Sequence, residues 1–80
     1  MNLKDYNIPY SGWKLLISEW IIGENAKRDR EVLILNLLDG MSLEEISALE
    51  HIDITPRQAS RVIEKRLPEV ISHIDFLARQ

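Results

Sequence analysis

The chain has 80 residues, which predicts a single small domain over residues 1–80 with one core. Hydrophobic residues make up 45% and charged residues 29% of the sequence, a globular composition that argues against a disordered tail or a membrane protein. The absence of cysteine excludes a disulfide framework and a thiolate zinc site, and the net charge of −3 by itself counts against nucleic-acid binding. The N-terminus lacks a signal-peptide pattern, and no apolar stretch approaches the roughly 18 residues that span a bilayer. We therefore expect a soluble, cytoplasmic protein with no membrane partner.

The first predicted helix follows a short arm that closes at Pro9 and Ser11-Gly12. It ends at Gly23, a natural C-cap. Two tryptophans in one stripe could form a ligand platform, but we expect core residues, because large aromatic side chains dominate burial in a small domain. The apolar stripe recurs at helical spacing through Trp13, Leu16, Ile17, Trp20 and Ile21.

A second helix is predicted from a cap at Asn25 to Gly40. A buried strand is the alternative for its apolar run, but the charged residues before the run and the glycine after it favour a helix. We expect this helix at the centre of the fold, because its apolar side chains point in nearly every direction. These side chains are Val32, Leu33, Ile34, Leu35, Leu37 and Leu38.

Two capping boxes predict two further helix starts. Ser42 with Glu45 opens a short third helix, which carries Leu43, Ile46 and Leu49 and gives way around His51-Ile52-Asp53. Thr55 with Gln58 opens a fourth helix, and Pro56 stands at its first position, where a missing N–H costs nothing.

The fourth helix is predicted to be amphipathic, with a basic outer face. At about 100° per residue, Ala59, Val62 and Ile63 gather on one side. Pro68 removes the hydrogen bond to the carbonyl of Glu64, which predicts a kink or a restart before a C-terminal amphipathic helix over residues 68–79. The outer face comprises Arg57, Ser60, Arg61, Glu64 and Lys65, and the C-terminal stripe comprises Val70, Ile71, Ile74, Leu77 and Ala78.

A short capped helix followed by a basic capped helix indicates a helix-turn-helix over residues 42–67, with residues 56–67 as the recognition helix in the major groove. Charge is polarised to suit this role, since residues 55–67 hold four basic residues and one acid, while residues 42–53 hold four acids and no lysine or arginine. The candidates for base edges are Arg57, Gln58, Ser60 and Arg61; those for the DNA backbone are Thr55, Lys65 and Arg66, extended by Lys27, Arg28 and Arg30.

The runs RDREVLILNLLDGMSLEEIS and TPRQASRVIEKRL carry a resemblance to a known family. They resemble the promoter-reading region four of sigma-70 family factors and small phage and prophage regulators of that type. The resemblance covers roughly half the chain and implies an all-α bundle of four to five helices that regulates transcription by binding double-stranded DNA. The connection between Leu43 and Thr55 is longer than in that family, and His51-Ile52-Asp53 stands where a turn glycine is expected.

An enzymatic role is not expected. The chain has two histidines, no cysteine and no Gly-rich phosphate loop, so it lacks the groups for nucleophilic, metal or nucleotide chemistry. We predict no cofactor, no metal and no small-molecule substrate. His51 is interpreted as a turn residue and His73 as a surface residue.

A protein-interaction module is the alternative function. In this hypothesis the helix-turn-helix is only a scaffold, and the residues Val70, Ile71, Ile74 and Leu77 dock a partner or a second copy of the chain. The sequence does not determine the target DNA sequence or whether the protein activates or represses transcription. It also leaves open whether the chain forms a homodimer or contacts RNA polymerase.

Overall fold

The structure is a computed structural model that describes the backbone of residues 8–78 and the side chains of residues 8–74. No strand occurs in these residues, and the predicted small all-α bundle is confirmed. The helices are α1 (Tyr10–Trp20), α2 (Ala26–Leu33), α3 (Leu43–Ser47) and α4 (Pro56–Ala78), and a π-helix, η2 (Ile34–Leu38), continues α2.

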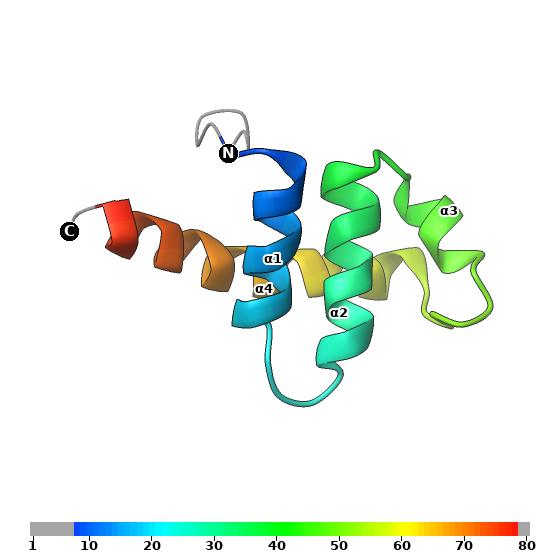
Figure 1. The fold of residues 1–80 in the computed structure, drawn as a ribbon. Helices are drawn as coiled ribbons and strands as arrows, with labels where there is room; N and C mark the ends of the chain where they lie inside the picture. Colours follow the sequence, from blue (N-terminus) through cyan, green and yellow to red (C-terminus); the bar gives the residue numbers. More distant parts are fainter. Residues whose placement is uncertain (1–7, 79–80) are drawn as a thin grey trace.

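The long helix α4 is the platform on which the other helices pack. Figure 1 shows α1 and α2 standing side by side with α4 running across both, and α3 on the far side of α2. The N-terminal half of α4 therefore lies next to α2 and α3, and its C-terminal half lies next to α1.

The core consists of two hydrophobic clusters joined at α2. Neighbouring residues Val32 and Leu33 are both fully buried and belong to different clusters, while the half-buried Ile63 packs against both. Because two neighbouring residues of one helix are buried in different clusters, the second predicted helix is central, as expected. The α1 cluster contains Trp13, Ile17, Ile21, Leu33, Val70, Ile71 and Ile74, and the α3 cluster contains Val32, Ile46, Ile52, Ala59 and Val62.

The start of α2 differs from the prediction in one respect. Asn25 precedes the helix as expected, but its side chain makes no capping hydrogen bond. Its backbone has φ of 63°, in the left-handed region, whereas a capping side chain normally belongs to an extended residue. The turn that reverses the chain between α1 and α2 sets this conformation, and Gly23, with φ of 93°, contributes to the same turn.

Both predicted capping boxes are present. Ser42 Oγ accepts the N–H of Glu45 at 3.1 Å, and the carboxylate of Glu45 accepts the N–H of Ser42 at 3.3 Å. Thr55 Oγ1 accepts the N–H of Gln58 at 3.1 Å, and Gln58 Oε1 accepts the N–H of Thr55 at 2.9 Å. Each box satisfies two backbone donors that a helix start would otherwise leave unpaired, so the starts of α3 and α4 are fixed locally.

The connection between α3 and α4 is longer than a minimal turn, because α3 ends at Ser47, earlier than expected. Leu49 packs against the α3 cluster, and Ile52 is buried in it, so the connection is anchored at two points. Asp53 adopts φ of 51° and so supplies the left-handed conformation for which a glycine was expected. Aspartate is one of the few residues with a side chain that tolerates this region.

Two expectations about the C-terminal third are corrected. The chain does not restart at Pro68, since α4 continues through it as one helix of 23 residues. The stripe beyond the proline is not free for a partner, because Val70, Ile71 and Ile74 are buried in the chain's own α1 cluster. Packing on both sides of the proline, against different parts of the bundle, stabilises the helix despite the lost hydrogen bond. The predicted interface residue Leu77 lies outside the described side chains.

Among the helices that the structure describes, none is long and apolar enough to cross a membrane.

Candidate nucleic-acid interface

The N-terminal half of α4 presents a cationic ridge to solvent. Arg57, Arg61 and Lys65 are exposed, one turn apart, and we call these three residues the α4 ridge. The opposite side of the helix is buried, with Ala59 0% and Val62 8% exposed. The predicted orientation of the helix is therefore confirmed, and its cause is the apolar contact with α2 and α3.

The charges of the α4 ridge have no ion-pair partner among the described side chains. Over residues 8–74, no carboxylate forms an ion pair with any of the three ridge side chains. Glu64, which shares the outer face, is exposed and likewise makes no ion pair in that part of the chain. Ser60 is half-buried at the edge of the face. The ridge thus retains charge that can be used for binding.

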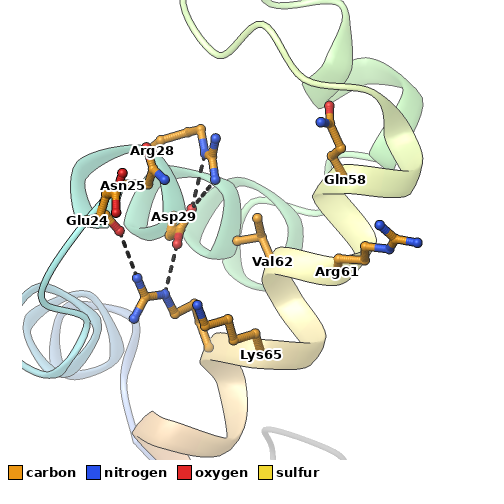
Figure 2. Close-up of a pocket in the computed structure, with 9 residues that line it drawn as sticks. Glu24, Asn25, Arg28, Asp29, Gln58, Arg61, Val62 and Lys65 are labelled. Atoms are coloured by element: carbon orange, nitrogen blue, oxygen red, sulfur yellow. Dashed lines mark hydrogen bonds and ion pairs between the residues drawn. The ribbon is translucent and has the colours of Figure 1, made fainter.

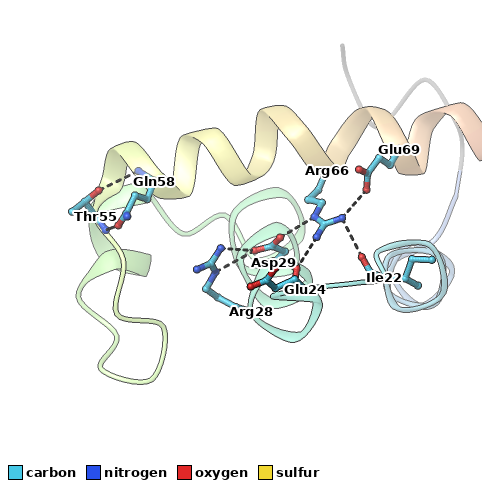
Figure 3. Close-up of polar contacts among 8 residues, drawn as sticks. All are labelled: Ile22, Glu24, Arg28, Asp29, Thr55, Gln58, Arg66 and Glu69. Carbon is cyan, nitrogen blue, oxygen red and sulfur yellow. Dashed lines mark hydrogen bonds and ion pairs between the residues drawn. The ribbon is translucent and has the colours of Figure 1, made fainter.

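Thr55 and Gln58 have a structural role at the start of α4. Each side chain accepts a backbone N–H of the other residue, as Figure 3 shows. Both residues are exposed, and the amide NH2 of Gln58 is left to donate outward. A bidentate contact with adenine needs the amide oxygen as well, which already accepts the capping bond and has one further lone pair.

Arg66, predicted to contact the DNA backbone, is instead buried and paired inside the protein, which corrects the prediction. It is 7% exposed, and its Nε donates to Asp29 Oδ2 at 2.8 Å. Its terminal nitrogens donate to the carbonyls of Ile22 at 3.2 Å and Glu24 at 3.1 Å and to the carboxylate of Glu69 at 3.2 Å (Figure 3). Four of the five N–H donors of the guanidinium therefore have partners inside the protein.

The Arg66 network fastens α4 to the chain reversal between α1 and α2. Its hydrogen bond with Asp29 raises the pKa of the guanidinium against the opposing effect of burial, so the group stays charged. Arg28 Nη2 also forms an ion pair with Asp29 Oδ1 at 3.1 Å, so the carboxylate of Asp29 pairs with two arginines. Sequence reasoning missed Asp29. Asp29 is the only acid in the run AKRDR, which indicates an ion pair with a basic residue but does not identify that residue.

The basic residues of α2 divide into available and occupied groups. Lys27 is exposed. Arg28 is paired with Asp29, yet its side chain is 35% exposed. Arg30 is half-buried and its Nε donates to the carbonyl of Ile21 at 2.8 Å, which closes the end of α1. Lys27 and Arg28 stay candidates for contact with DNA, and Arg30 has a structural role.

A groove of about 300 Å³ lies between the start of α2 and the N-terminal half of α4. Figure 2 shows Arg28 on the α2 wall, Lys65 on the α4 wall, and Val62 and Asp29 between them. The structure thus brings together predicted residues from two helices that are distant in sequence. The remaining lining residues are Glu24, Asn25, Gln58, Arg61 and Arg66.

The two histidines make contacts that the sequence did not indicate. His51 lies in the turn, as predicted, and its Nε2 pairs with the carboxylate of Glu31 on α2. His73 is half-buried rather than a plain surface residue, because its ring stacks on Trp20 with centroids 3.5 Å apart. Neither belongs to a cluster of metal-ligating groups within the residues described.

Comparisons with family models, curated proteins and solved structures found no match to this chain.

Proposed function

We propose that this protein binds duplex DNA and regulates transcription, with the N-terminal half of α4 in the major groove. The observation that carries the proposal is the α4 ridge: three exposed cations, one turn apart, on a helix whose other side is buried. The resemblance of the sequence to region four of the sigma-70 family supports the same function.

The dimensions of the ridge suit the groove. The major groove of B-DNA is about 12 Å wide and admits a single helix, whose diameter with side chains is about 10–12 Å. Arg57 and Arg61 lie in the first two turns of α4, from which side chains reach base edges. An arginine can donate two hydrogen bonds to guanine, so these residues are the proposed base readers.

The uneven distribution of charge, and not the acidic total, supports a defined orientation on DNA. The acids Glu44, Glu45 and Glu50 are exposed on α3 and the turn after it, in a region without lysine or arginine. Repulsion from phosphates at this end and attraction at the α4 ridge would favour one approach of the domain to the duplex.

For the alternative function, docking of a partner on the C-terminal stripe, the described residues of that stripe offer no free surface. Val70, Ile71 and Ile74 are at most 9% exposed and pack against α1.

The proposed function is tested with the variants Arg57→Ala and Arg61→Ala and the charge-matched control Lys14→Ala, on the exposed side of α1. Fluorescence anisotropy with labelled duplexes selected from a random pool should show a loss of about 1–3 kcal/mol for each ridge variant. The control should bind like the wild type. Far-ultraviolet circular dichroism verifies that all three fold. Equal affinity of both ridge variants and the wild type would refute the assignment of the recognition helix.

A further inference from the structure

We infer that the groove between the start of α2 and α4 is an anion site that takes one phosphate group of the DNA backbone. The DNA source of this phosphate rests on the proposed function, whereas the anion site itself rests on the groove. The walls come from α2, the turn that precedes it and α4, which the Arg66 network joins.

The charge of the groove is opposite to that of the whole chain. Four of its lining residues are cationic and two are acidic, which gives a formal charge of +2 in a chain whose total is −3. The cationic residues are Arg28, Arg61, Lys65 and Arg66, and the acidic ones are Glu24 and Asp29.

Of the two acids, Asp29 lies at the base of the groove, and Glu24 is exposed and opposes the cations Arg61 and Lys65. Asp29 is 4% exposed and is shared by Arg28 and Arg66, so its charge is already compensated at the base. Lys65 and Arg61 are exposed and make no ion pair in the part of the chain with described side chains. An anion between Arg28 and Lys65 would therefore meet the unpaired ammonium of Lys65 and the exposed part of the Arg28 side chain, which also pairs with Asp29.

The chemistry of the groove favours a phosphate over an organic anion with a large apolar part. Its polar lining supplies guanidinium, ammonium and amide donors, and Val62 is its one apolar residue. The positive end of the α2 dipole adds to the same field. A phosphodiester next to the α4 ridge would anchor the DNA backbone while Arg57 faces the bases.

Glu24 provides a test that distinguishes an anion-binding groove from a groove with only a structural role. It is the exposed acid of the groove, its backbone carbonyl accepts Arg66, and its carboxylate forms no ion pair within the described residues. The change Glu24→Gln should therefore tighten phosphate binding without removing a contact that holds the fold.

The first experiment titrates the full chain with inorganic phosphate and follows backbone amide shifts by nuclear magnetic resonance. Saturable shifts around Arg28 and Lys65 are expected. The affinity for phosphate that they report should rise in Glu24→Gln, fall several-fold in Arg28→Gln and Lys65→Gln, and stay unchanged in the control Lys14→Gln. Lys65→Gln breaks no ion pair and keeps the test valid if Arg28→Gln loosens α2. The absence of saturable shifts at the groove would overturn the site.

The second experiment measures duplex binding as a function of salt. Because Arg28 and Lys65 share one phosphate, the double variant should lower the slope of log affinity against log salt by about 0.9, the value for one phosphate, rather than twice that. An unchanged slope overturns the phosphodiester assignment, even where inorganic phosphate binds. If Arg57→Ala and Arg61→Ala keep full affinity while the groove variants lose it, the base-reading role fails and the phosphate site stands.

Discussion

Replacing Arg66 with methionine tests the largest structural departure from the sequence-based expectation. The guanidinium bridges three segments: it binds Asp29 at 2.8 Å and the carbonyls of Ile22 and Glu24 at 3.2 and 3.1 Å. Methionine keeps the apolar stem of the side chain but cannot donate, so the carboxylates of Asp29 and Glu69 and two carbonyls lose this donor.

The expected cost is about 3 kcal/mol of unfolding free energy. Removing one partner of a buried ion pair typically costs about 3–5 kcal/mol. We expect the lower end for two reasons. Arg28 still pairs with Asp29, and the molecule measures 41 × 25 × 19 Å, so water lies close to every buried group. A domain of this length has a total stability on the order of 5–10 kcal/mol, so the loss is easily measured.

Urea unfolding followed by far-ultraviolet circular dichroism measures this loss. The matched control is Lys65→Met, the same type of change one position earlier at an exposed site, which should stay within about 0.5 kcal/mol of the wild type. The reasoning is refuted if Arg66→Met loses less than about 1 kcal/mol, since a solvated surface pair costs no more than that.

Three further changes test the core, the turn and one surface contact. Leu33→Ala, at a fully buried position, should lower the free energy of unfolding in urea by about 2–5 kcal/mol. Leu15→Ala, at a position that is 60% exposed, should leave it nearly unchanged, and equal losses would contradict the core assignment. Asp53→Val should cost about 1–2 kcal/mol because φ is 51°, whereas Asp53→Asn should be nearly neutral; a neutral valine would contradict the left-handed turn. The hydrogen bond of Tyr10 to Asp39 raises the pKa of the phenol, so this contact stabilises the fold at lower pH and is lost as pH rises through the raised pKa. In an ultraviolet titration, Asp39→Asn should lower that pKa, and an unchanged titration would show that the contact is absent in solution.

Helix starts and the faces of α4 were predictable because they depend on near neighbours. The Ser42 and Thr55 boxes each act within three residues, and a helical period alone places Arg57 and Arg61 opposite Ala59. Such features need no knowledge of how the helices pack. The sequence therefore indicated an all-α bundle and the position of its exposed cations.

The tertiary structure decided which polar and apolar side chains have partners within the protein and which remain free to bind another molecule. Arg66 looked like one more cation of a basic helix, but Asp29 and Ile22, its partners, are 37 and 44 residues away in the chain. The apolar period of Val70 and Ile74 is the same whether the stripe meets a partner or α1. Local patterns determine the face on which a side chain stands, and only the long-range packing of helices determines what that face meets.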